Sequence, residues 1–215
     1  MIRGPYLLAT RSEGKLRELR EIFADFELNV IDLRSARIER RGDEDELERY
    51  STFEENALAK ARYFFERGNG TPTFADDSGV CVDALNGEPG VFSKRWSGLT
   101  DLPEPEIDAA NNAKLVRSMQ RARGEQGSRF TDSAKYVAVA AYKDAGIEVV
   151  RRGEIPGRIL ERPRGNGGFG YDPFFESPDL GGTFAESVLR NTASVSHRSR
   201  AFRALLTALR VEGRI

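Results

Sequence analysis

Apolar and polar positions follow two different periods in the first third of the chain. Tyr6–Ala9 is a short apolar run of the kind that forms a buried strand, and the polar stretch Thr10–Lys15 follows it. Residues 28–33 alternate and are rich in branched side chains, which is typical of a second strand. Between them, apolar residues recur at helical spacing at Leu16, Leu19, Ile22 and Phe23. Strand, loop, helix and strand in this order predict the opening of an α/β fold.

The pattern changes in the middle of the chain. Residues 36–50 are almost all charged and predict an exposed acidic loop. A helix is predicted over about 52–67, capped by Thr52 or by the serine before it. A strand containing the sequence ADDSG follows, and then a helix over 103–123 and a loop over 124–128.

Several strands are predicted close together in the last part of the chain. Tyr136–Tyr142 reads as a long buried strand, and Ile147–Gly153 returns as its hairpin partner. Ile155–Leu160 is a further candidate strand, a glycine-rich loop covers Gly165–Gly170, and a final amphipathic helix starts near Ser196. Adjacent strands framed by helices indicate a mixed sheet.

Length and composition limit the class of protein. A chain of 215 residues forms one domain, 1–215, or one domain with a small second lobe. The net charge of −1 argues against a broad nucleic-acid-binding surface. The single cysteine, Cys81, excludes an internal disulfide, and no Cys/His cluster could hold zinc. No apolar stretch is long enough for a signal peptide or a membrane span, so we expect a cytoplasmic protein.

The segment FADDSGVCVDALNGEPGV, residues 74–91, carries the first candidate chemistry. Adjacent carboxylates such as Asp76 and Asp77 repel each other, so a fold that brings them together offsets the repulsion with a cation or shifts their pKa values. Hard oxygen ligands suit Mg²⁺ better than zinc. The alternative is that Asp-Asp-Ser-Gly simply forms a turn.

Three further features could bind an anion. The loop TRSEGK, Thr10–Lys15, can present backbone N–H groups at a helix N-terminus, or it can be an ordinary capped helix. Lys60 lies at the edge of an apolar helical stripe, one turn after Asn56, where it must either snorkel or find an anion. Ser196 can cap the last helix and so place His197 and Arg198 in its first turn. Cations at that end oppose the helix dipole unless an anionic ligand lies in front of them.

The loop GNGGFGYDPFF is the fourth candidate. Its glycines let the backbone approach a ligand, Phe169 and Tyr171 offer rings on which a base can stack, and Asp172 can accept a hydrogen bond. The alternative is a hairpin turn with core aromatics. Carboxylates, cations at helix ends and an aromatic glycine loop are together complementary to a nucleoside triphosphate.

These motifs, in this order, resemble the inosine triphosphate pyrophosphatase family, which hydrolyses non-standard purine nucleoside triphosphates. The likeness covers nearly the whole chain: ATRSEGKLREL, TFEENALAKAR, ADDSGVCVDALNGEPGV, NNAKL, RGNGGFGYDPFF, TFAE and SHRSRA. The resemblance implies an elongated mixed α/β fold of two lobes with the site in a central cleft, and a homodimer. It also implies Mg²⁺-dependent hydrolysis of ITP, dITP and XTP to the monophosphate and pyrophosphate.

The resemblance also implies roles for individual residues. Asp77 matches the general base and a metal ligand, Glu48 matches a second metal ligand, and Asp76 and Lys60 complete the catalytic set. Phe169 would stack on the purine, and His197 and Arg198 would recognise its six-position oxygen. The implied substrate-binding residues are Thr10, Arg11, Ser12, Glu13, Gly14, Lys15, Ser78, Phe169, Gly170, Tyr171, Asp172, Thr192, His197 and Arg198.

The chain departs from the family pattern at three positions. Arg11 stands where the family usually has glycine, Ser12 where it has a phosphate-contacting asparagine, and Thr192 where it has a lysine. Arg11 or Arg190 could restore the lost charge. The acidic stretch 42–47 resembles an insertion, which leaves Glu39, Glu44 and Glu46 as competitors of Glu48 for the metal.

Three other functions remain open at this point. One is a pyrophosphatase for modified pyrimidine or methylated nucleotides, and another is a nucleotide-binding sensor without catalysis. The third is a nucleic-acid-binding module built on SHRSRAFR and RARG, which the net charge disfavours.

Overall fold

Two compact units make up the chain, and each is assembled from segments that are far apart in sequence. The computed structural model describes residues 4–215, with the backbone only for Leu189 and Arg190. The first unit contains the chain up to residue 77 together with 138–153 and 196–215, and the second contains 78–137 and 154–195. The expectation of a single domain over 1–215 stays a prediction.

The strands form a mixed sheet in the order β2-β1-β3-β4-β5-β6-β7. Strand β1 is parallel to β2 and β3, whereas β6 is antiparallel to β5 and β7. This confirms the predicted mixed α/β fold. The strands are β1 (Tyr6–Leu8), β2 (Val30–Asp32), β3 (Thr73–Val82), β4 (Ser133–Lys143), β5 (Glu148–Ile159), β6 (Phe175–Ser177) and β7 (Gly182–Thr183).

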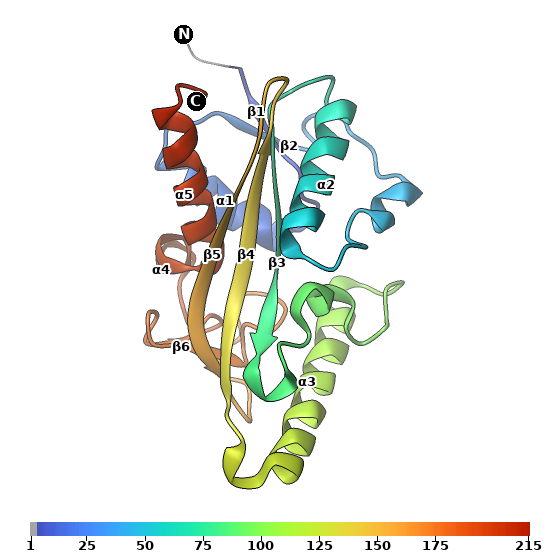
Figure 1. The fold of residues 1–215 in the computed structure, drawn as a ribbon, viewed down its shortest axis with the longest axis vertical. Helices are drawn as coiled ribbons and strands as arrows, with labels where there is room; N and C mark the ends of the chain where they lie inside the picture. The colour runs from blue at the N-terminus through green and yellow to red at the C-terminus, as the bar shows by residue number, and fades with distance from the viewer. Residues whose placement is uncertain (1–3) are drawn as a thin grey trace. The chain divides into compact units, whose positions relative to one another are not determined.

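The first unit packs three helices against its strands. Figure 1 shows α2 (Phe53–Arg67) and α5 (His197–Val211) on opposite sides of these strands. Helix α1 (Glu13–Ala24) buries the predicted apolar stripe and packs with α5. The core between them is aromatic, because the ring of Phe23 lies 4.9 Å from that of Phe74 and 5.7 Å from that of Phe202. Edge-to-face ring pairs of this kind add to the free energy gained by burying apolar area.

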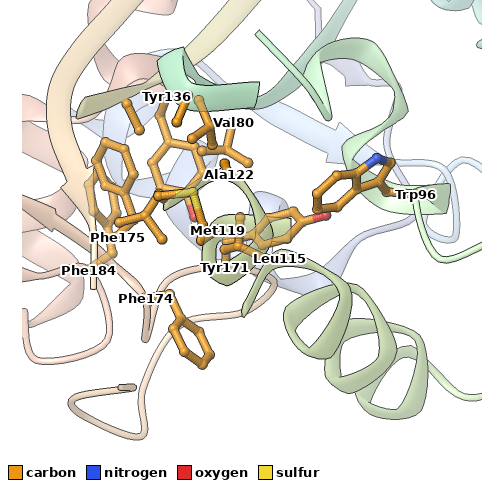
Figure 2. Close-up of a cluster of buried hydrophobic side chains, with 14 of the residues drawn as sticks. Val80, Trp96, Leu115, Met119, Ala122, Tyr136, Tyr171, Phe174, Phe175 and Phe184 are labelled. Atoms are coloured by element: carbon orange, nitrogen blue, oxygen red, sulfur yellow. The ribbon is translucent and has the colours of Figure 1, made fainter. Parts of the chain in front are cut away.

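The second unit has a separate apolar core, shown in Figure 2. Its helices are α3 (Glu104–Gln126) and α4 (Leu189–Val195), and α3 contributes Leu115 and Met119 to the core. The ring of Tyr136 lies 4.2 Å from that of Phe175 and 5.1 Å from that of Phe184. None of the helices between residues 4 and 215 combines the length and the apolar character that a membrane span needs.

Glycines account for two wrong predictions. Strand β5 is continuous through Gly153, whereas separate strands were expected on either side of this residue. A Cβ at Gly153 would lie 2.3 Å from the carbonyl oxygen of His197, so this glycine admits the N-terminus of α5 and does not end a strand. Helix α3 likewise continues through Gly124 to Gln126 and is capped by Gly127, whose φ is +56°.

Short elements were not predicted in the second unit and in the acidic segment. Strands β6 and β7 have three and two residues, and α4 has seven. The acidic segment that was expected to be a loop contains a 3-10 helix, Gly42–Glu46. Elements of this length contain too few positions for a period of 2 or 3.6 to be recognised.

Candidate active site

Strand β3 presents its two adjacent aspartates to different sets of partners. Successive side chains of a strand point to opposite faces of the sheet. The carboxylate of Asp76 accordingly contacts Lys15 and Arg198, and that of Asp77 contacts Lys60 and Asn56. Both aspartates are buried within an extended strand, which excludes the turn interpretation. The cations expected from charge repulsion are present, but the two carboxylates contact different cations and do not share one.

The Asp76 carboxylate is held ionised. Its Oδ2 lies 3.0 Å from Lys15 Nζ and 3.2 Å from Arg198 Nε. Burial acts to raise the pKa of Asp76, but Lys15 and Arg198 outweigh it and hold this pKa well below its usual range. Its Oδ1 is buried and receives no hydrogen bond from any described residue. An ionised, buried oxygen of this kind is suited to a ligand that brings a cation or a donor.

The loop before α1 has the features of an anion site. Ser12 is the N-cap of α1, where its Oγ accepts from Lys15 N at 3.5 Å, and Ser12 N donates to Thr10 Oγ1 at 3.2 Å. Glu13 is exposed and Gly14 half-buried in the first helical turn. The N-terminus of α1 therefore offers backbone donors and the Lys15 ammonium on one short segment.

Arg11 does not add a cation to that loop. Its guanidinium forms a two-pronged ion pair with Glu44, with Nε to Oε2 at 2.7 Å and Nη2 to Oε1 at 2.8 Å. The expectation that Arg11 restores charge for a phosphate is therefore not supported by its position. The side chain of Arg190, the other candidate, lies outside the described part of the chain.

On the other face, Lys60 joins two carboxylates. Its Nζ lies 2.7 Å from Glu48 Oε1 and 3.4 Å from Asp77 Oδ1, and Asn56 Nδ2 donates to Asp77 Oδ2 at 2.9 Å. Only 8% of Lys60 is exposed, so it has found anions and does not snorkel. Burial acts to lower the pKa of Lys60, but Glu48 and Asp77 outweigh it and keep the ammonium charged.

Asp77 has the character of a base. Burial raises its pKa, and the charge of Glu48 raises it further, although Lys60 acts in the opposite direction. A carboxylate with a raised pKa accepts a proton more readily at neutral pH.

Of the acidic residues considered for a metal, Glu48 shares the Lys60 ammonium with Asp77. Glu44 is bound by Arg11 and Arg67, and Glu46 faces Arg49 at the surface. No group of three His, Cys, Asp or Glu side chains in residues 4–215 is arranged to hold a metal. Mg²⁺ commonly takes one or two protein carboxylates and completes its shell with water and phosphate oxygens, so two oxygen donors are sufficient.

The charge at the N-terminus of α5 is balanced by carboxylates of the same unit. Ser196 is the N-cap, with its Oγ accepting from Ser199 N at 3.0 Å, and its hydroxyl donates to Glu18. Arg198 is ion-paired with Glu18 as well as with Asp76. Burial holds the pKa of His197 well below its usual range, and the charge of Arg198 adds to this effect, so the imidazole is neutral. The argument that two cations there require an anionic ligand is therefore wrong, because Glu18 and Asp76 supply the anions.

The glycine-aromatic loop of the second unit is closed by Asp172. Its Oδ2 accepts from Phe169 N at 2.9 Å and its Oδ1 from Tyr136 Oη at 3.0 Å. Gly168 has φ +70°, and a Cβ there would meet Asp172 Oδ2 at 2.2 Å, so only glycine allows this closure. Phe169 as a whole residue is 38% exposed, and it offers a surface for stacking.

Other predicted residues of the second unit lie as follows. Gly170 is fixed by Asp108, which accepts from its N–H at 2.8 Å, and by Asn112, which donates to its carbonyl at 2.9 Å. Tyr171 is 5% exposed and lies in the core of Figure 2, so the expectation that it offers a ring to a base is wrong. Ser78 follows Asp77 in β3, and the hydroxyl of Thr192 in α4 donates to the carbonyl of Val188, the residue before that helix.

Sequence reasoning missed two residues that order the site. Glu18 is buried and holds both Ser196 and Arg198. Glu18 lies one turn before Ile22 on α1, on the apolar face of the helix. A charged residue on that face was the feature of the sequence that could have indicated a buried ion pair. Asn56 is fully buried beside Asp77 and was noticed only as a neighbour of Lys60.

Comparison with known proteins identifies the family. The model of the Ham1 family matches residues 6–208. The chain belongs to the Ham1 family. The resemblance stated from the motifs is thereby confirmed.

Ham1 relatives match over nearly their full length. A Thermus thermophilus protein named dITP/XTP pyrophosphatase is 42% identical over 97% of this chain and 93% of its own. A Frankia alni protein of the same name is 42% identical over 95% of this chain and 96% of its own. The solved structure of a HAM1 protein from Coxiella burnetii has a TM-score of 0.78 at 32% identity and covers 97% of this chain and 99% of its own.

Proposed function

We propose that this Ham1 protein hydrolyses ITP, dITP and XTP to the nucleoside monophosphate and pyrophosphate, with Mg²⁺ as cofactor. The observation that carries the proposal is the pair of buried carboxylates on strand β3 together with the cations that surround them. Asp76 is matched by Lys15 and Arg198, and Asp77 by Lys60 beside Glu48. The names of the Ham1 relatives supply the reaction and the substrate class.

The proposed mechanism assigns the proton to Asp77. Its carboxylate takes a proton from water, the water oxygen bonds to the α-phosphorus, and the bond from that phosphorus to the bridging oxygen breaks to release pyrophosphate. Lys15, Lys60 and the N-terminus of α1 bind the phosphates and offset their charge. Glu48 and Asp77 would hold Mg²⁺, which supplies charge neutralisation of the polyphosphate when bound.

Base recognition is proposed for two groups of residues. Phe169 would stack on the purine through its exposed ring. His197 and Arg198 would donate to the six-position oxygen of hypoxanthine and xanthine. Adenine presents an amino group there, so a buried donor would be left unpaired and adenine nucleotides would be rejected.

The test is pyrophosphate release from dITP, XTP, dGTP, dATP and dTTP, each with Mg²⁺ and with EDTA. We expect metal-dependent release from dITP and XTP only. Asp77→Asn should lower kcat by roughly 10²- to 10⁴-fold, because it removes the proton acceptor but keeps the shape of the side chain. Asp83→Asn, an exposed aspartate six residues later, is the matched control and should retain full activity.

Near-wild-type turnover by Asp77→Asn would remove the proposed base. Fast release from dTTP, or none from any nucleotide by the folded protein, would contradict the proposed substrate class. A homodimer is also proposed, from the family resemblance alone, and light scattering of the purified protein tests it. The expected absence of nucleic-acid binding stays a prediction.

A further inference from the structure

The acidic segment 42–47 is fastened to the rest of the first unit through the buried carboxylate of Glu44, and Asp43 adds an exposed hydrogen bond from Tyr63 Oη at 2.6 Å. Only 8% of the Glu44 side chain is exposed, although its neighbours Asp43 and Asp45 are surface charges. It accepts from Arg11 Nε at 2.7 Å and Nη2 at 2.8 Å, from Arg67 Nη1 at 2.9 Å, and from Arg41 N at 3.1 Å. Two-pronged, charge-assisted contacts of this kind are among the strongest hydrogen bonds in proteins.

The two arginines come from different elements. Arg11 lies in the loop before α1, and Arg67 is the last residue of α2. Each also binds the backbone that leads into the segment: Arg11 Nη2 donates to the carbonyl of Ile38 at 3.2 Å and Arg67 Nη2 to that of Glu39 at 2.8 Å. The two guanidinium groups therefore hold the segment and its approach together.

Glu48 follows this segment directly. It lies four residues after Glu44, and its carboxylate is 2.7 Å from Lys60 Nζ, which also contacts Asp77. The Glu48 side chain is 34% exposed, and the residue belongs to no helix or strand. The position of its backbone beside Lys60 thus depends on how firmly the preceding residues are held.

We propose that Arg11, Glu44 and Arg67 form a positioning cluster that fixes residues 42–47 and thereby places Glu48 for metal binding. Arg11 then acts on the reaction through Glu48, and not by contacting a phosphate. This inference rests on the proposed function for its metal and its reaction, whereas the anchoring of the segment stands on the contacts alone.

The test compares Arg11→Met, Glu44→Gln and their double variant. Arg62→Met is the matched control. Arg62 is also on α2 and makes an equally two-pronged pair, with Glu148 of β5. Amide hydrogen exchange of residues 41–49, without metal or nucleotide, reports the anchoring. The Mg²⁺ concentration for half-maximal dITP hydrolysis, and the KM for dITP at saturating Mg²⁺, report the effect on the site.

We expect faster exchange of residues 41–49 in Arg11→Met and Glu44→Gln, and a half-saturating Mg²⁺ concentration raised roughly tenfold, as for other residues that orient metal ligands. The double variant should be no worse than the worse single variant, because the two residues act as one unit. Arg11→Lys keeps the positive charge but cannot make the two-pronged contact. It should therefore bring both the exchange rate and the Mg²⁺ dependence only part of the way back to the wild-type values. Arg62→Met should change neither quantity.

Two results would overturn the proposal. One is unchanged exchange in Arg11→Met, whatever the activity. The other is a raised KM for dITP in Arg11→Met with unchanged Mg²⁺ dependence and a normal Glu44→Gln, which would make Arg11 a phosphate ligand. If the wild-type protein hydrolyses no dITP, the proposed function fails. Exchange, together with Mn²⁺ affinity measured by paramagnetic resonance, then still decides the role of the cluster.

Discussion

Acidification below about pH 6.5 is expected to destabilise the protein through its buried histidine. His197 is the only histidine of the chain, it is buried, and its pKa lies well below the usual value because of burial and the nearby Arg198 charge. In the unfolded chain the same group has a pKa of about 6.5. Between these two pKa values the unfolded state binds a proton that the folded state does not, so stability falls as the pH falls below about 6.5.

The size of the effect follows from that difference. At pH 5.5 the unfolded imidazole is about 90% protonated, which stabilises the unfolded state by about 1.4 kcal/mol, whereas at pH 7.5 the same contribution is under about 0.1 kcal/mol. The free energy of unfolding should therefore be about 1.3 kcal/mol lower at pH 5.5 than at pH 7.5 from His197 alone.

Urea unfolding of the wild type and of His197→Gln at pH 5.5, 6.5 and 7.5 measures this contribution. Carboxylates titrate in both proteins, including Asp77, whose raised pKa acts with the opposite sign, so the difference between the two pH dependences isolates the histidine. Parallel pH dependences in the two proteins would refute the reasoning, because they would show that His197 takes up its proton equally in the folded and unfolded states.

Two further predictions follow from contacts within the first unit and from the glycines. Lys60→Met removes the ammonium that lowers the pKa of Asp77, so the acid limb of the pH profile of kcat/KM should move to higher pH; an unmoved limb would argue against Asp77 as the base. Gly153→Ala should destabilise the protein by about 1–3 kcal/mol, because its Cβ would overlap the α5 backbone. Gly124→Ala lies in open space within α3 and should stabilise the protein by about 1 kcal/mol. Thermal unfolding of the two variants checks both values.

The sequence predicted the elements that carry strong periods or recognisable caps. Helix α1 was found from its apolar stripe, and α2 and α5 begin after Thr52 and Ser196, the residues expected as caps. The strand carrying Asp76 and Asp77 was found as well. The hydrophobic effect and helix capping act over a few neighbouring residues, so their signals are local in the sequence.

Partners of the site residues could not be predicted in the same way. Arg11 and Glu44 are 33 positions apart, and Arg198 meets Glu18 across 180. Such pairs depend on tertiary packing, which no local pattern records. The motif match placed Lys60 at a phosphate, but only the fold shows that Glu48 and Asp77 share its ammonium.

The alternation of Asp76 and Asp77 limits how this part of the chain can evolve. A substitution in β3 leaves the direction of its neighbours unchanged, but a one-residue deletion or insertion just before Asp76 would rotate both carboxylates to the wrong sides. A deletion would move Asp77 into the place of Asp76, beside Lys15 and Arg198, and an insertion would move Asp76 into the place of Asp77, beside Lys60. In either case the other aspartate would be left two residues along the strand from the partners on its new face. The number of residues in β3 is therefore as strongly constrained as their identity, whereas the surface stretch ahead of α2 is free to vary in length wherever an anchor such as Glu44 can hold it.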